Sequence, residues 1–185
     1  MFDIVGAAAG LVAFSPAMAV IAIAVWCEDG GPVLFRQLRL GHDRRPFAIL
    51  KFRSMRGARV TRVGRLVRAS GLDELPQFIN ILRGDMSAVG PRPLTEADVH
   101  RLRWTTPEHD FRWRIRPGLT GLAQLAGTES AAAALALDRA YVERRSLMLD
   151  CQLVALSFVV NVMGKSRVRT WLRQGRLVAD PRPRR

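Results

Sequence analysis

The segment Ile4–Trp26 reads IVGAAAGLVAFSPAMAVIAIAVW and contains no ionisable side chain. As an α-helix it would be about 34 Å long, which is enough to cross the hydrocarbon core of a bilayer. It is apolar on every side, which disfavours a helix buried in a soluble core. It is also too long for the apolar region of a signal peptide, and no basic residue precedes it. The segment therefore predicts membrane association.

Ser15-Pro16 lies at the centre of this segment. Proline removes a backbone donor and kinks or breaks a helix. Two half-helices of about 11 residues each would enter one leaflet and return, and the Ser15 hydroxyl is available to satisfy the freed backbone. A kinked span with its N-terminus outside fits the same residues. The residues alone leave both topologies open.

The net charge of +13 is concentrated in two segments of the 185-residue chain. Residues 35–70 hold eleven basic side chains and one acidic one, and residues 165–185 hold eight and one. Such segments attract nucleic acid, acidic lipid headgroups or a phosphorylated substrate. The two cysteines and three histidines exclude a disulfide framework and disfavour a zinc enzyme.

The remaining patterns predict a mainly α fold with a small β-hairpin. The hairpin is expected from Val33–Leu40 and 46–52, which flank a polar loop. A helix is expected at Thr61–Ala69, with Val63, Leu66 and Val67 on its apolar face. A second is expected at Leu75–Leu82, opened by Asp73 and with Pro76 in its first turn. Two more are expected at Ser130–Leu147 and at Met148–Met163, the latter as an interfacial or core helix. Residues 84–93 and 116–121 are expected to form rigid, turn-rich loops.

The adjacent carboxylates Asp73 and Glu74 are the candidate chemical groups. An ionised Asp is a nucleophile that needs no general base, but cations must first neutralise a phosphate target. Lys51, Arg68 and Arg92 can supply that charge. The two carboxylates also offer hard oxygen ligands for Mg²⁺. Alone, an Asp-Glu pair at a helix start is more often a cap.

These residues lie in motifs that resemble the bacterial sugar transferase family, the monotopic phosphoglycosyl transferases that begin exopolysaccharide, O-antigen or glycoprotein-glycan assembly. The motifs are GPVLFRQLRLG (31–41), PFAILKFRSM (46–55), TRVGRLVRASGLDELPQFINILRGDMSAVGPRP (61–93), RPGLTGLAQLAG (116–127) and LDRAYVERRSLMLD (137–150), with Phe2-Asp3-Ile4 and Ser15-Pro16 before them. The resemblance covers about residues 2–163. The segment between Met55 and Thr61 is shorter than is common in the family.

The resemblance implies transfer of a sugar 1-phosphate from a UDP-sugar to undecaprenyl phosphate with release of UMP and a requirement for Mg²⁺. It implies a phosphosugar ester on Asp73, assistance by Glu74 at the metal or with proton transfer, and phosphate binding by Lys51, Arg68 and Arg92. It also favours re-entry of the N-terminal helix at Ser15-Pro16. The active site would then face the cytoplasm at the bacterial inner membrane.

We therefore expect a re-entrant membrane helix at 1–27, a catalytic domain with interfacial amphipathic helices at 28–164, and a basic C-terminal tail at 165–185. The expected partners are the UDP-sugar, undecaprenyl phosphate and anionic lipid headgroups, and no nucleic acid. The alternatives are a membrane-tethered nucleic-acid-binding protein and an inactive scaffolding paralogue. The sugar, the glycan pathway and homo-oligomer formation stay open.

Overall fold

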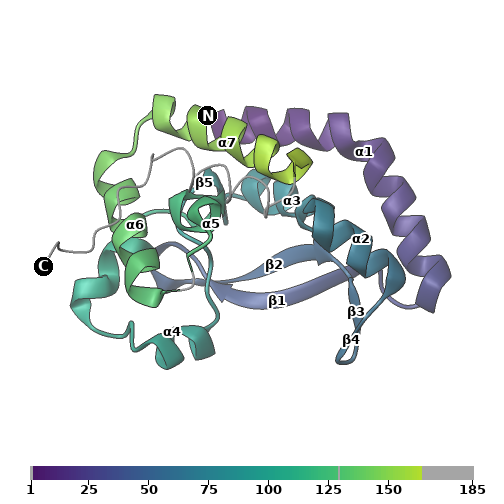
Figure 1. Ribbon diagram of the computed structural model, residues 1–185, viewed down its shortest axis with the longest axis horizontal. Helices are drawn as coiled ribbons and strands as arrows, with labels where there is room; N and C mark the ends of the chain where they lie inside the picture. The colour runs from purple at the N-terminus through teal and green to yellow at the C-terminus, as the bar shows by residue number, and fades with distance from the viewer. Residues whose placement is uncertain (1, 129, 164–185) are drawn as a thin grey trace, which may run out of the picture.

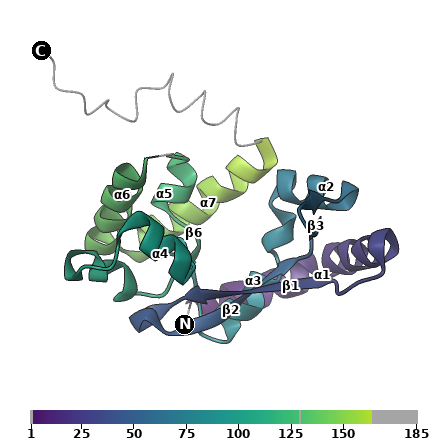
Figure 2. The same ribbon diagram turned by 90° about the horizontal axis from the view of Figure 1, so that it is seen from below.

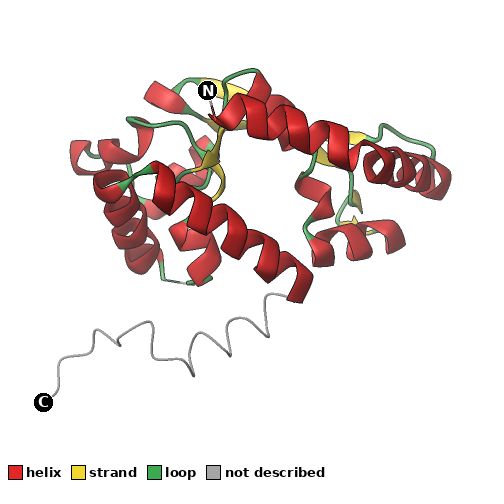
Figure 3. Cartoon of the chain, turned by 90° about the horizontal axis from the view of Figure 1, so that it is seen from above, coloured by secondary structure: helices red, strands yellow, loops and turns green. Residues whose placement is uncertain are grey.

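The computed structural model of the protein describes residues 2–128 and 130–163, so the basic tail expected at 165–185 lies outside the described residues. The described part is mainly helical and contains three small two-stranded sheets (Figure 3). This agrees with the predicted mainly α fold, although only one of the three sheets was expected.

The N-terminal helix α1 (Phe2–Asp29) is, among the described residues, the one helix long and apolar enough to cross a membrane. Pro16 lies inside it. Proline has no N–H to donate to the carbonyl four residues earlier, that of Val12. The Ser15 hydroxyl donates to this carbonyl instead, at 2.8 Å. Figure 1 shows α1 changing direction along its length, so the expected break is a bend within one helix.

Polar side chains near both ends of α1 bind the rest of the protein. The Asp3 carboxylate accepts hydrogen bonds from the Ser87 hydroxyl at 2.8 Å and the Ala88 N–H at 3.0 Å. At the other end, Glu28 accepts from the first two N–H groups of α2 (Arg62–Ser70), at 2.6 and 2.9 Å. Asp29 forms an ion pair with Arg53. Both ends of α1 are thus fixed to the same domain.

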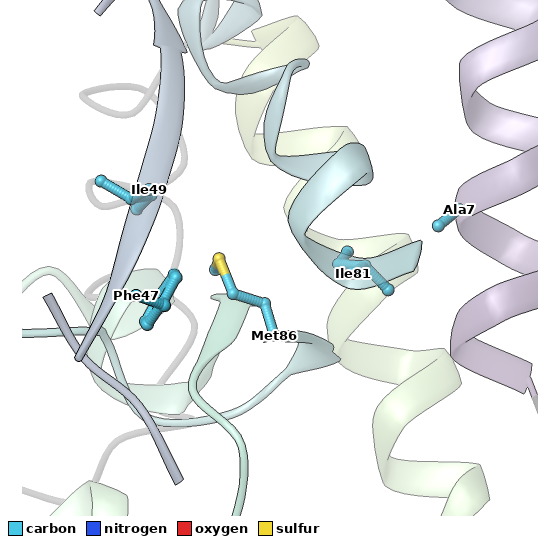
Figure 4. Packing of buried hydrophobic residues seen from close by; sticks show 5 residues of the cluster. All are labelled: Ala7, Phe47, Ile49, Ile81 and Met86. Atoms are coloured by element: carbon cyan, nitrogen blue, oxygen red, sulfur yellow. The ribbon is translucent and has the colours of Figure 1, made fainter. Parts of the chain in front are cut away.

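The hairpin consists of β1 (Leu34–Leu40) and β2 (Pro46–Phe52), which pair antiparallel, as predicted. A short 3-10 helix, η1 (His42–Arg44), lies in the connecting loop. Helix α3 (Gln77–Leu82) lies between the hairpin and α1. Figure 4 shows Ile81 of α3 between Ala7 of α1 and a group formed by Met86 with Phe47 and Ile49 of β2. This cluster holds the apolar helix against the hairpin.

Helix α2 begins where the sequence predicts, because the Thr61 side chain accepts a hydrogen bond from the Gly64 N–H at 2.9 Å. Val67 is buried against α1, whereas Leu66, which was expected on the same apolar face, is 73% exposed. The short segment before α2 forms a tight hairpin of β3 (Met55–Arg56) and β4 (Arg59–Val60).

The turn between α2 and α3 differs from the prediction. Leu72–Glu74 forms a 3-10 helix, η2, and α3 begins only at Gln77. Pro76 is the residue that precedes α3, and no side chain caps that helix. Asp73 therefore does not open α3, and its carboxylate is not used as a helix cap.

Two segments expected to be loops form a parallel sheet. Strand β5 (Ser87–Val89) pairs with β6 (Gly118–Thr120), so that Ser87 lies opposite Gly118 and Val89 opposite Thr120. The glycines and prolines around both strands do indicate turns, but each strand is too short for an alternating pattern. Only contact between segments far apart in the sequence creates this sheet.

Five helices follow β5 along the described part of the chain. They are α4 (Glu96–Leu102), the 3-10 helix η3 (Pro107–Trp113), α5 (Leu122–Ala126), α6 (Ala131–Arg144) and α7 (Leu147–Met163). Helix α7 contacts both strands of this sheet. Figure 2 shows α4, α5 and α6 at one end of the hairpin and α2 at the other. Val89, Ile115, Tyr141 and Leu153 form the core that joins the sheet to α6 and α7. The candidate site residues come from different elements: Lys51 from β2, Arg68 from α2, Asp73 and Glu74 from the turn after α2, and Arg92 from the segment after β5.

Candidate active site

The carboxylate pair lies in a sharp turn between two helices. Gly71 ends α2 with a φ of +74°, a left-handed conformation that glycine adopts without the steric cost of a Cβ. The chain then forms η2, which carries Asp73 and Glu74, both partly exposed. A glycine at this position therefore lets the chain reverse and present both carboxylates beside β2.

Lys51 contacts the second carboxylate of the pair. Its Nζ donates to Glu74 Oε1 at 2.5 Å, and the two side chains are 19% and 31% exposed. Lys51 lies near the end of β2 and Glu74 at the end of η2, so this ion pair joins the hairpin to the turn. The structure therefore brings the predicted phosphate-binding lysine directly to the predicted dyad.

Asp73 is in a different environment from Glu74. No ion pair to Asp73 is found among residues 2–128 and 130–163. Burial raises the pKa of Asp73 above its usual value, and the neighbouring Glu74 charge raises it further. Lys51 and Arg68 act in the opposite direction. Two of the three predicted cations thus lie close enough to influence this carboxylate.

A shallow cleft next to the dyad collects further polar groups. Its polar lining includes Arg39, Lys51, Glu74, Gln77, Arg92 and Gln124. Lys51, Glu74 and Arg92 therefore line one cleft, whereas Asp73 and Arg68 are not on its wall. Ser15 and Pro16 are exposed residues of α1 and do not line it.

Sequence reasoning missed Arg39, which lies on the same face of the hairpin as Lys51. Arg39 opposes Phe47, and Phe35 opposes Lys51. Since opposed residues share a face and side chains alternate along a strand, Arg39 and Lys51 point to the same side. Burial lowers the pKa of Arg39, and the neighbouring Arg92 lowers it further. The alternation in β1 is a signal for this residue, but it identifies the face only once the strand register is known.

Gln77 and Gln124 were also missed. Gln77 is the first residue of α3 and is 2% exposed, while Gln124 lies in α5. The carbonyl oxygen of the Gln124 side chain is buried without a hydrogen-bond partner among the described residues. Neither glutamine belongs to a charge pattern or a spacing that marks a site in the sequence.

The donor groups at the dyad are compatible with Mg²⁺. Mg²⁺ typically binds one or two carboxylates and takes its remaining ligands from water and substrate phosphates. Asp73 and Glu74 provide the two carboxylates, although one Glu74 oxygen is bonded to Lys51. Within the described residues, no cluster of three or more His, Cys, Asp or Glu side chains could hold a metal. An ion here would therefore depend on oxygens of the substrate.

Comparison with known proteins finds relatives over most of the chain. UDP-glucose:undecaprenyl-phosphate glucose-1-phosphate transferase of Caulobacter vibrioides is 42% identical over 175 residues, covering 83% of this chain and 66% of that protein. UDP-N-acetylgalactosamine-undecaprenyl-phosphate N-acetylgalactosaminephosphotransferase of Aeromonas hydrophila is 39% identical over 171 residues, covering 82% and 40%. Exopolysaccharide production protein ExoY of Rhizobium meliloti is 37% identical over 184 residues, covering 83% and 80%.

This chain thus spans less than two thirds of the length of the first two relatives. The model of the family described as bacterial sugar transferase matches residues 1–164. The match includes the dyad, the three predicted cations and the apolar helix. Since it covers most of the sequence, the chain belongs to the bacterial sugar transferase family.

Proposed function

We propose that the protein transfers a sugar 1-phosphate from a UDP-sugar to undecaprenyl phosphate, the first membrane step in making a bacterial surface polysaccharide or glycoconjugate. The observation that carries this proposal is the carboxylate of Asp73, free of an ion pair within the described residues and acted on by Lys51 and Arg68. The names of two relatives specify different sugars, glucose and N-acetylgalactosamine. We therefore leave the transferred sugar open.

The proposed reaction has two displacement steps at one phosphorus atom. A carboxylate oxygen of Asp73 attacks the β-phosphorus of the donor and forms an acyl phosphate. The bond from that phosphorus to the bridging oxygen breaks, and UMP leaves with the oxygen and its electron pair. A phosphate oxygen of the lipid then attacks the same phosphorus and releases the Asp73 carboxylate.

Cations are needed because the nucleophile and its target are both negative. Two unit charges 4 Å apart repel by about 4 kcal/mol at an effective dielectric constant near 20. Lys51 and Arg68 near Asp73, together with Arg92 in the adjacent cleft, can neutralise the two phosphates. We infer that Asp73 and Glu74 would hold Mg²⁺, and that the ion would supply positive charge to balance the phosphates of the donor.

We also propose that α1 re-enters the membrane rather than crossing it. Asp3, near the start of the helix, binds β5, while Glu28, near its end, binds α2. Between these ends, α1 packs on α3 and α2 through Ala7, Ile21 and Val25. A span perpendicular to the membrane would carry one end away from the catalytic domain. The two attachments instead favour both ends on the cytoplasmic side of the inner membrane.

The exposed apolar surface supports the same placement. Val5, Val12 and Val20 of α1 are more than 60% exposed, and Met148 and Phe158 of α7 are similarly exposed. Such large apolar side chains are stabilised by contact with lipid rather than water. The basic residues of 35–70 would add attraction to anionic headgroups, about 1 kcal/mol for each Lys or Arg near the surface.

The covalent intermediate provides the direct test. The protein in lipid nanodiscs is incubated with a UDP-sugar and no lipid phosphate, and the peptide that contains Asp73 is analysed by mass spectrometry. We expect the added mass of one sugar phosphate and one equivalent of UMP. Asp73→Asn should give neither, whereas Asp43→Asn, the same change in an exposed loop, should behave as the wild type.

A panel of UDP-sugars, each supplied with undecaprenyl phosphate, then identifies the donor by continuous UMP release. Active protein without added mass on the Asp73 peptide would refute the covalent role. Absence of UMP release with every donor, together with salt-sensitive binding of DNA or RNA, would favour the nucleic-acid-binding alternative.

The topology is tested by cysteine labelling. Positions 2 and 27 are exposed and lie near opposite ends of α1, so Phe2→Cys and the native Cys27 each provide a thiol for labelling. Cys151→Ser removes the remaining thiol, which would otherwise react as well. In inverted membrane vesicles, we expect an impermeant maleimide to modify both positions. Modification of residue 2 only from the periplasmic side would show a spanning helix and refute re-entry.

A further inference from the structure

The segment from the end of β5 to Leu94 presents Arg92 to the cleft, and most of its backbone carbonyls accept hydrogen bonds. Three of these bonds come from side chains: Tyr141 Oη donates to the Val89 carbonyl at 3.2 Å, Arg112 Nη2 to the Arg92 carbonyl at 3.1 Å, and Arg39 Nη1 to the Pro93 carbonyl at 3.3 Å. Two come from the backbone: Gly118 N donates to the Pro91 carbonyl at 3.0 Å, and Leu40 N to the Leu94 carbonyl at 2.8 Å. The Gly90 N–H donates to the Thr120 carbonyl at 2.9 Å. We call residues 89–94 the arginine loop. Its backbone is fixed while the Arg92 side chain stays exposed.

Arg112 is the contact that reaches the backbone of Arg92 itself. Its Nε donates to Asp138 Oδ2 at 2.9 Å, while its Nη2 donates to the Arg92 carbonyl. The two side chains of the Arg112–Asp138 pair are only 5% and 4% exposed. The guanidinium also lies over the rings of Trp104 and Trp113, at 4.7 and 5.5 Å from their centroids. One planar group thus links α6 to the arginine loop through η3.

Stability alone does not account for this arrangement. Removing two charges from water is costly, and a buried ion pair is often no more stabilising than apolar residues of the same volume. The pair is useful where a planar guanidinium must hold two acceptors in fixed directions, which a lysine cannot do. The second acceptor here is the backbone of the residue that we expect to bind phosphate.

We propose that Arg112 and Asp138 are positioning residues for donor binding: they fix the backbone at Arg92 so that its guanidinium meets the diphosphate of the UDP-sugar in the cleft. This inference rests on the proposed function. Arg112 acts only through Arg92 and touches no reacting atom. Its contribution to donor binding must therefore disappear when Arg92 no longer binds phosphate.

A double-mutant cycle measures this dependence. Arg112→Lys keeps the positive charge beside Asp138 but replaces the two separate donor nitrogens, Nε and Nη2, with a single ammonium that does not reproduce their positions. We expect the KM for the UDP-sugar to rise about tenfold, with a smaller change in kcat, and Arg92→Gln to raise KM at least as much. In the Arg92→Gln background, Arg112→Lys should change KM by less than twofold. Arg114→Lys, the same change at an exposed neighbour, is the control.

Equal effects of Arg112→Lys with and without Arg92 would overturn the inference, because the two residues would then act independently. If Arg112→Lys does not fold, Asp138→Asn replaces it in the cycle, since the amide oxygen can still accept from Arg112 Nε while the charge is lost. Wild-type protein that releases no UMP refutes the proposed function instead. The two failures are thus distinct.

Discussion

The turn at 71–74 and the arginine loop at 89–94 both present charges to the site, but they are held in different ways. Residues of the turn take part in three backbone hydrogen bonds, all to residues three positions away: Gly71 N to Arg68 O at 3.4 Å, Glu74 N to Gly71 O at 3.2 Å and Leu75 N to Leu72 O at 3.3 Å. Its carboxylates are balanced by side-chain cations. The arginine loop is instead held along its backbone by β1, β6, η3 and α6.

This difference matches the two tasks that we propose for the segments. A nucleophile must have the right protonation state, which nearby charges set. A residue that binds phosphate must keep its position, because orientation set before binding costs nothing during the reaction. A change of charge near the turn should therefore alter the pH dependence of kcat/KM. A change of charge at the arginine loop should instead alter the KM for the UDP-sugar.

The largest expected effect is that of Glu74→Gln. The change replaces the charged partner of Lys51, which is also a proposed metal ligand, with a neutral amide, so we expect kcat/KM to fall by at least about a hundredfold. It also removes a charge that raises the pKa of Asp73. Asp73 then stays ionised to lower pH, and the acid limb of the kcat/KM profile should move to lower pH. An unchanged acid limb with large residual activity would contradict the assignment of Asp73 as the titrating group.

The next effect separates the two segments directly. Arg68 lowers the pKa of Asp73, so Arg68→Gln should raise that pKa. The ionised nucleophile is then lost at a higher pH, which moves the acid limb upward, with a loss of about tenfold in kcat/KM at neutral pH. Arg92 is not among the charges that shift Asp73, so Arg92→Gln should raise KM and leave the acid limb in place. Equal shifts in both variants would remove the proposed distinction.

Features encoded in contiguous sequence could be predicted. The hairpin follows from alternation around a polar loop, α2 from the helical spacing of its apolar residues, and the dyad from two adjacent carboxylates beside basic segments. These signals depend on neighbours in the chain. Of the polar residues that line the cleft, only Lys51, Glu74 and Arg92 were predicted.

Features that need long-range pairing could not be predicted. The β5–β6 sheet has three residues in each strand, too few for a period, and exists only because distant segments meet. Arg39 required the hairpin register, and the bond between Arg112 and Asp138 joins η3 to α6. A single basic residue carries no signal of which distant acid it will contact. The side chains that bond the backbone of the arginine loop could therefore not be predicted from the sequence, whereas Arg92 itself was predicted.

The smallest expected effect tests the fixed segment through its stability. The Tyr141 hydroxyl donates to the carbonyl of Val89, the first residue of the arginine loop, at 3.2 Å and to Asp150 Oδ1 at 2.7 Å. Tyr141→Phe keeps the ring but leaves the buried Val89 carbonyl and the half-buried Asp150 carboxylate without the hydroxyl. We expect the free energy of unfolding to fall by about 1–2 kcal/mol. For a chain of this size, each kcal/mol lowers the melting temperature by about 2–4 °C, which thermal unfolding in detergent measures. The acid limb should not move, because Tyr141 does not act on Asp73. Melting at the wild-type temperature would mean that this bond does not support the loop, and the contrast with the turn would then rest on Arg39 and Arg112.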